Sequence, residues 1–153
     1  MTYYETDSTG VLTSPEYLAR VNDPTPETHR IMTSVFKNMN RTICRRADGA
    51  GAIRAAFTVA VAATEGGAVD LNDLPAAQPE TLWRETWISA EPDNQEVSEE
   101  ESLRGRDAKI SACALIDCAT EQDALSLASR ISLPGTRISV YKLTFSLNAA
   151  DLP

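Results

Sequence analysis

The chain has 153 residues, of which 42% are hydrophobic and 24% are charged, the composition of an ordinary globular protein. Its formal net charge is −8 and its pI is near 4.6, so phosphate backbones and anionic membrane surfaces would repel it. We therefore expect neither nucleic acid nor a membrane as a partner. The length predicts a single α+β domain over residues 1–153, in which residues 1–50 form a helical N-terminal extension.

Two helix starts open the chain. Ser14-Pro15 and Thr25-Pro26 each place a capping hydroxyl before a proline, which is the pattern of a helix N-terminus. Asp23-Pro24 breaks the first of these helices. Apolar residues at helical spacing after Pro26 predict a long amphipathic helix that runs to about Arg46.

Residues 52–65 carry two conflicting signals. Their alanine content favours a helix, whereas the alternation of Phe57, Val59 and Val61 would suit a strand. We favour the helix, because alanine has the highest helix propensity and is depleted in strands. The stretch from Val69 to Leu74 predicts a short strand or an extended segment.

Aromatic, Thr and Ile residues predict a strand over Thr81–Ser89. Strand alternation places Trp83, Glu85 and Trp87 on one face. The acidic stretch Glu91–Glu101 predicts a solvated loop. It lacks the ordered spacing and the turn glycine of a calcium-binding loop, so we expect no metal there.

The last fifty residues carry the clearest pattern. An apolar run over Ile110–Cys118 predicts a central strand buried on both faces. Thr120 predicts the cap of a helix that runs to Ile131. Thr136–Leu147 predicts a second strong strand, whose alternation changes phase. Either a bulge near Val140 or cover on both faces would explain that change.

Several of these segments follow the order of a known family, over about half the chain. They are Gly66-Gly67, Thr81-Leu82-Trp83-Arg84, Leu115-Ile116-Asp117-Cys118-Ala119-Thr120-Glu121-Gln122-Asp123-Ala124-Leu125 and Ile138-Ser139-Val140-Tyr141-Lys142-Leu143. In this order the chain resembles the YCII-related (DGPF) domain. The resemblance implies a ferredoxin-like α+β fold that pairs into a dimeric α+β barrel with a pocket. It also implies a small-molecule enzyme that uses a His–Asp pair.

The family's catalytic residues do not transfer to this chain. The DGPF segment would fall at Glu99-Glu100-Glu101-Ser102, where none of its four residues matches. The only histidine, His29, lies in an N-terminal helix that the family pattern does not include. Function must therefore be argued from this chain's own side chains.

The candidate site is built on the Trp83, Glu85, Trp87 strand face. Two tryptophans beside a carboxylate would line an aromatic pocket for a flat or cationic ligand. We assign Glu85, His29 and Tyr141 as candidate proton-transfer groups, with Trp83 and Trp87 as substrate-binding walls. The alternative is that the tryptophans pack in the core or at a dimer seam, with Glu85 near a rim, His29 a surface residue and Tyr141 a cross-strand packing residue.

The cysteines and the chain's start point to a cofactor-free cytoplasmic protein. Cys44, Cys113 and Cys118 match no metal signature and are expected to be buried thiols in a reducing compartment. Residues 1–7 show no secretory signal, and the apolar stretch 55–63 is far shorter than a membrane span. No glycine-rich phosphate loop is visible, so neither a metal nor an organic cofactor is predicted.

Two functions follow as hypotheses. The first is a small-molecule enzyme of specialised metabolism that performs acid–base chemistry of the lyase, isomerase or cyclase type in a barrel pocket. The second is a non-catalytic homodimeric module that binds a ligand or a protein partner. The helix predicted from Pro26 to Arg46 would suit the second use.

Overall fold

The chain's structure is a computed structural model that describes residues 1–36, 39–64, 69–70, 73, 78–91 and 96–146. It divides into two compact units. Unit 1 comprises Met1–Arg45 and Ile88–Ile110, and unit 2 comprises Arg46–Trp87 and Ser111–Pro153. Each unit therefore combines segments that are far apart in the sequence.

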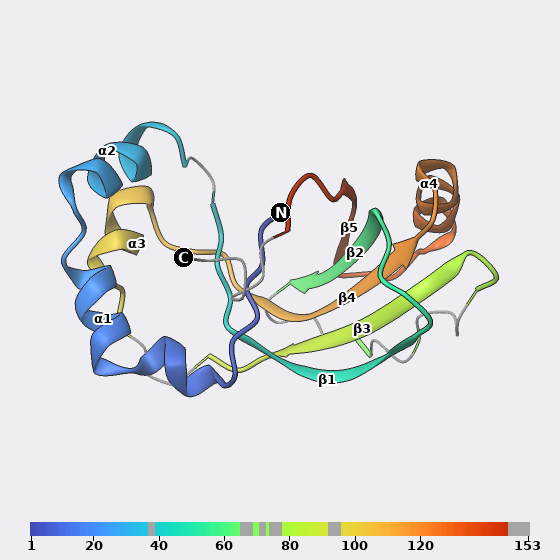
Figure 1. Cartoon of the computed structure of the whole chain (residues 1–153), viewed down its shortest axis with the longest axis horizontal. Coiled ribbons are helices and arrows are strands. Elements are labelled where there is room, and N and C mark those ends of the chain that lie inside the picture. Colours follow the sequence, from blue (N-terminus) through green and yellow to red (C-terminus); the bar gives the residue numbers. More distant parts are fainter. Residues whose placement is uncertain (37–38, 65–68, 71–72, 74–77, 92–95, 147–153) are drawn as a thin grey trace. The chain divides into compact units, whose positions relative to one another are not determined.

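Unit 1 is helical. It holds the 3₁₀ helix η1 (Thr9–Thr13) and the α-helices α1 (Pro15–Asn22), α2 (Pro26–Ser34) and α3 (Glu99–Arg104). Both α1 and α2 contact α3, as Figure 1 shows. Ser14 and Thr25 accept hydrogen bonds from backbone N–H groups three residues on, so the two predicted N-caps are confirmed.

Two predictions in this unit were wrong. Helix α2 ends at Ser34 and does not continue to Arg46; Val35 and Phe36 are exposed, and Cys44–Gly51 is a strand. Helical spacing is a local signal, and sheet pairing overrides it here. The predicted acidic loop becomes helical at Glu99, because Ser98 caps the helix and acidic residues are favourable in its first turn.

A polar network ties the two segments of unit 1 together. The Arg104 guanidinium pairs with Asp107, and both side chains are buried. Arg104 also donates to the Met39 carbonyl at 3.2 Å, and Lys109 Nζ donates to the Arg41 carbonyl at 2.8 Å. These bonds fix the chain around residues 39–43 against the segment that follows α3.

Unit 2 is built on a five-stranded antiparallel sheet. Its strands are β1 (Cys44–Gly51), β2 (Phe57–Thr64), β3 (Thr81–Ser89), β4 (Ile110–Cys118) and β5 (Thr136–Lys142), in the spatial order β1-β3-β4-β2-β5. One end of β1, of β3 and of β4 falls in unit 1. The helix α4 (Glu121–Arg130) follows β4. The described residues thus form an α+β structure that is compatible with a ferredoxin-like fold.

The segment predicted as a helix over residues 52–65 is instead the strand β2. It lies between β4 and β5, and Val59, Val61 and Ala63 are fully buried. A helix would leave the backbones of both neighbouring strands unpaired, so pairing outweighs the propensity of its alanines. Of the short strand or extended segment predicted over Val69–Leu74, the described residues Val69, Asp70 and Asp73 are not in a strand, and the rest lies outside the described residues.

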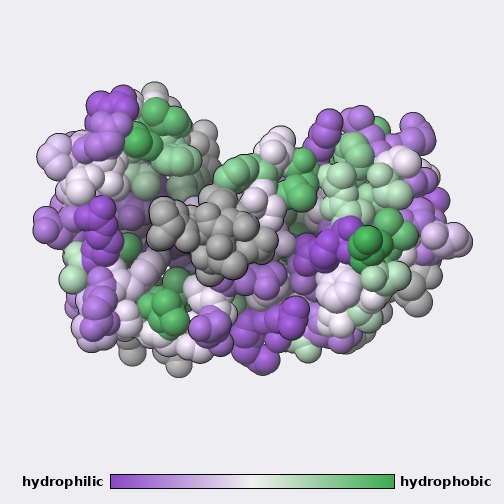
Figure 2. Space-filling view, viewed as in Figure 1, coloured by the Kyte–Doolittle hydropathy of each residue, from purple (hydrophilic) through white to green (hydrophobic). Residues whose placement is uncertain are grey.

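The hydrophobic core of unit 2 lies between α4 and one face of the sheet. Its buried members are Val59, Val61, Ala114, Ile116, Cys118, Ala124, Leu127 and Ile131. The predicted central strand at Ile110–Cys118 and the helix capped by Thr120 are both confirmed. On the outer strand β1 almost every residue is exposed, and the surface that it forms is largely hydrophilic (Figure 2).

Strand β5 pairs with β2 in an uninterrupted antiparallel register, from Phe57 opposite Lys142 to Ala63 opposite Thr136. No bulge occurs at Val140, so that explanation of the phase change was wrong. The strand ends at Lys142, and the predicted endpoint Leu147 lies outside the described residues. The bond from Leu143 N to the Ala56 carbonyl, at 2.7 Å, extends the same register by one pair.

The core predicts a sharp contrast between two leucines of α4. Leu127 is 2% exposed and Leu125 is 49% exposed. Leu127→Ala should lower the free energy of unfolding by about 2–5 kcal/mol, because it leaves a cavity in the core. Leu125→Ala, the matched control, should change it by less than about 0.5 kcal/mol. Urea denaturation measures both, and equal effects would contradict this packing of α4.

Candidate functional site

The connection between β1 and β2 determines the layout of the candidate site. Because β3 and β4 lie between these two strands, residues 52–56 must cross the end of the sheet. Gly51 begins the crossing with a φ of 151°, and a Cβ there would lie 2.3 Å from the Leu82 carbonyl oxygen. Only glycine permits this approach, in which Ala52 N donates to the same carbonyl at 2.9 Å.

Arg54, in the middle of the crossing, binds carboxylates on two neighbouring strands. Its Nε donates to Asp117 Oδ2 of β4 at 2.7 Å, and one terminal nitrogen donates to Glu85 Oε1 of β3 at 3.0 Å. The Glu85 and Asp117 side chains are 0% and 1% exposed, whereas that of Arg54 is 42% exposed. The guanidinium therefore separates two buried carboxylates from solvent.

The two carboxylates differ in their further partners. Asp117 also accepts from Ala55 N at 3.3 Å and from the Thr58 hydroxyl at 2.8 Å, so it holds both the crossing and the start of β2. Glu85 accepts one more bond, from the Trp83 indole at 3.4 Å. The Trp83 ring also faces Arg54, whose guanidinium carbon is 5.8 Å from the ring centroid.

The cluster of Arg54, Glu85 and Asp117 carries more negative than positive charge. Two carboxyl groups share one guanidinium, so the formal charges of the three side chains sum to −1, and both carboxyl groups are buried. Burying charge is costly unless it is paired and hydrogen-bonded. Arg54 therefore offsets the cost of burying both carboxyl groups.

Tyr141 belongs to the same row of side chains. It lies directly opposite Thr58 on β5, and directly opposite residues of an antiparallel pair share a face. Thr58 in turn donates to Asp117, which Arg54 joins to Glu85. A polar row thus crosses β3, β4, β2 and β5 on the sheet face opposite α4, because Asp117 alternates with the core residues Ile116 and Cys118.

The remaining predicted residues lie differently. Strand alternation places Trp87 on the same face as Glu85, and its buried indole Nε1 has no hydrogen-bond partner among the described residues. His29 is exposed on α2 and belongs to unit 1. The structure thus joins Glu85 and Trp83 by a direct contact and puts Tyr141 and Trp87 on their face of the sheet.

The cysteines have the character of buried thiols. Cys113 and Cys118 are buried on opposite faces of β4, and Cys44 is half-buried. Burial and the nearby Glu91 carboxylate raise the pKa of Cys44 to about 11, and burial raises that of Cys118 as well. Protonated thiols are poor nucleophiles and poor metal ligands. In the described part of the chain, no three His, Cys, Asp or Glu side chains gather as a metal site would require.

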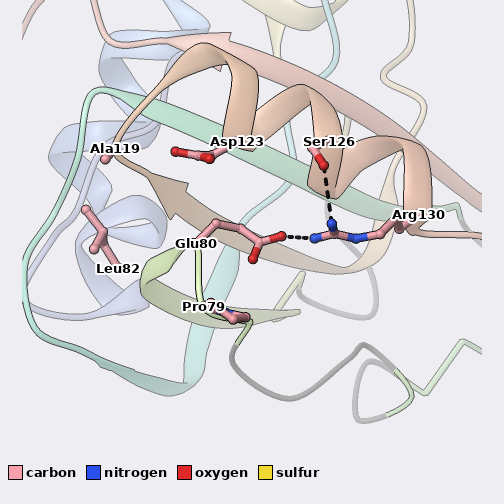
Figure 3. A pocket seen from close by; sticks show the side chains of 7 residues that line it. All are labelled: Pro79, Glu80, Leu82, Ala119, Asp123, Ser126 and Arg130. Atoms are coloured by element: carbon pink, nitrogen blue, oxygen red, sulfur yellow. Dashed lines mark hydrogen bonds and ion pairs between the residues drawn. The ribbon is translucent and has the colours of Figure 1, made fainter.

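An open groove of about 460 Å³ lies on the other side of the sheet, beside α4. Its lining residues are Pro79, Glu80, Leu82, Ala119, Asp123, Ser126 and Arg130, drawn in Figure 3. None of them was predicted as a site residue. Leu82 alternates with Trp83 and Glu85 along β3, so the groove and the polar row are on opposite faces of the sheet.

Of the four side chains joined in this cluster, sequence reasoning named Glu85 and Trp83 as candidates but not Arg54 or Asp117. Asp117 did leave a signal, because it is the one charged residue in the apolar run of β4, where an unpaired carboxylate would be costly. Arg54 left none, since its role depends on a crossing that a helix over residues 52–65 would not make.

Comparison with known proteins gave no match, whether to family models, to curated proteins or to solved structures. The resemblance to the YCII-related domain therefore stays a prediction. None of the described helices has the length and apolar character that crossing a membrane would need.

The cluster predicts that Arg54 contributes more to stability than other surface arginines. We expect Arg54→Met to cost about 2–3 kcal/mol, somewhat less than the roughly 3–5 kcal/mol for a fully buried pair, because water screens its half-exposed guanidinium. The control Arg137→Met, at an exposed position of β5, should cost less than about 0.5 kcal/mol. Equal effects in urea denaturation would mean that the two buried carboxylates do not need Arg54.

Proposed function

We propose that the protein is a small-molecule enzyme that performs acid–base chemistry without a cofactor, of the lyase, isomerase or cyclase type. Its site is the sheet face that carries Glu85, with Trp83 and Trp87 as walls and Tyr141 in the same row. The observation that carries the proposal is the burial of Glu85 and Asp117 on neighbouring strands with a single guanidinium between them.

The two carboxylates would have separate roles. Asp117 is held by donors from the crossing and from β2, and it fixes the geometry. Glu85, with fewer partners, is the group that would take a proton from a carbon acid and return it to another position of the same molecule. Arg54 would stabilise the negative charge that develops on the substrate.

Access to Glu85 requires the Arg54 side chain to move, because Glu85 is fully buried beneath it. Arg54 belongs to the crossing, in which Ala52, Ile53 and Ala56 are also exposed. A substrate with its own positive or hydrogen-bonding group could replace the guanidinium at Glu85 while Asp117 keeps its backbone donor. His29 belongs to unit 1, and we give it no role in the proposed chemistry.

The non-catalytic module is the second candidate. One observation favours it: every contact of Asp117, and the contact of Arg54 with Glu85, also serves to hold the crossing in place. In that case the cluster would be purely structural, and the protein would act through a bound ligand or partner without turnover.

We further propose that the working form is a cytoplasmic homodimer whose sheets pair as a dimeric barrel, as the YCII-related resemblance implies. Exposed apolar side chains beyond β5 support it, since Leu143 and Phe145 are 56% and 71% exposed. Light scattering at micromolar concentration should give the mass of two chains. A monomeric mass would refute the dimer but leave the chemistry at Glu85 untouched.

Glu85→Gln separates the two candidate functions. It keeps the shape and the acceptor for Arg54 but removes the capacity to transfer a proton. In an enzyme, turnover should fall by roughly 10²–10⁴-fold while the melting temperature stays nearly unchanged. Glu121→Gln, at an exposed position of α4, is the control.

The assay begins with a thermal-shift screen of small aromatic and polyketide-like compounds, followed by product analysis of each stabilising compound. If a compound is converted equally fast by the wild-type protein and by Glu85→Gln, Glu85 is not the proton-transfer group. If compounds bind with only a modest change in affinity in Glu85→Gln and none is converted, the non-catalytic module is the better description.

A further inference from the structure

The groove beside α4 has the features of a second site, independent of the Glu85 face. Its volume of about 460 Å³ falls within the range of small-molecule sites, roughly 300–1,000 Å³. Three of its polar residues, Asp123, Ser126 and Arg130, are spaced by three and four positions along α4. They therefore lie in line on one side of the helix.

The two ends of this line carry opposite charge. Figure 3 shows the Arg130 guanidinium at one end, joined to Glu80 and Ser126, and the Asp123 carboxylate toward the other. Arg130 has a half-exposed side chain, and these two bonds use only two of its five N–H donors. The planar fork that remains suits a carboxylate.

Asp123 supplies the complementary end. Its Oδ2 accepts the Thr120 hydroxyl at 2.6 Å, and both Asp123 and Glu80 contribute negative charge to the groove. With one guanidinium for two carboxylates, the Asp123 end is suited to an ammonium group. Leu82, Ala119 and Pro79 give the groove apolar surface between and beside these charges.

The distance between Asp123 and Arg130 along α4 determines how long the ligand must be. Arg130 is seven positions after Asp123, which is about 10 Å along a helix axis. An extended peptide spans at most about 3.5 Å per residue, so three residues cover that distance, whereas one or two residues do not. Ser126, whose oxygen already accepts from Arg130, still has its O–H to donate to a peptide carbonyl midway.

We propose that this groove binds a free peptide of three residues, with its ammonium group at Asp123 and its carboxylate at Arg130. Nothing in this proposal depends on the chemistry at Glu85, because its residues lie on the other face of the sheet. The Glu80–Arg130 pair presents the guanidinium to the groove, and the apolar lining takes small side chains.

The test uses trialanine and two blocked forms, N-acetyl-trialanine and trialanine amide, in titrations followed by amide chemical shifts of the wild-type protein. Trialanine should perturb Leu82 and Ser126, and each blocked form should bind about tenfold or more weakly, the loss expected for one charge-assisted contact. These three titrations use only the wild-type protein, so their result stays valid even if a substitution impairs folding.

Two variants then test which groove residue binds each end of the peptide. In Asp123→Asn, which keeps an oxygen for Thr120, trialanine should bind as weakly as its acetylated form does to the wild type, and acetylation should have no further effect. In Arg130→Gln, trialanine should bind as weakly as trialanine amide does to the wild type, and amidation should have no further effect. Ser129→Ala, an exposed position of α4 outside the groove, should leave all affinities unchanged.

Two results would overturn the proposal. One is the absence of any shift at Leu82 and Ser126 with millimolar trialanine. The other is equal affinity for the free and the blocked peptides, which would show that the terminal charges of the peptide do not contribute to binding.

Discussion

The bond between Arg54 and Asp117 is the interaction on which the arrangement of unit 2 depends. The order β1-β3-β4-β2-β5 obliges the chain to leave an edge strand and re-enter the sheet beyond two others. Asp117 accepts hydrogen bonds from the crossing, through the Arg54 side chain and the Ala55 backbone N–H, and from β2, through the Thr58 hydroxyl. One buried carboxylate thus binds the middle of the crossing, at Arg54 and Ala55, while Ala52 and Ala56 at its two ends bond to the backbones of β3 and of the segment after β5.

The same bond explains how Glu85 can be buried on that face. A lone carboxylate between two tryptophans would be costly to bury, and Arg54 offsets that cost by reaching it from the crossing. Arg54 therefore has a part both in the fold and in the proposed chemistry. Arg54 stabilises the fold while it covers Glu85, and any substrate that reaches Glu85 must compete with it. Stability and activity should respond in opposite ways to changes that loosen the crossing.

The sheet divides unit 2 into two chemical environments. On the α4 side, apolar side chains form the core, and a charged groove opens beside α4. On the other side, the polar row from Glu85 to Tyr141 crosses four strands. Because alternate residues of one strand serve the two faces, Leu82 lines the groove while its neighbour Trp83 donates to Glu85. Each face can therefore be altered separately.

Where the signal was local and strong, the sequence by itself determined the structure: the caps at Ser14, Thr25 and Thr120, the strand over Thr81–Ser89, and the buried strand over Ile110–Cys118. Strand alternation likewise placed Trp83 and Glu85 together. Only the tertiary structure decided that the alanine-rich segment is a strand, that Cys44–Gly51 joins the sheet, and that Arg54 meets Asp117. Those outcomes depend on backbone pairing and charge contacts between residues far apart in the sequence, such as Phe57 with Lys142 and Arg54 with Asp117, which no local propensity contains.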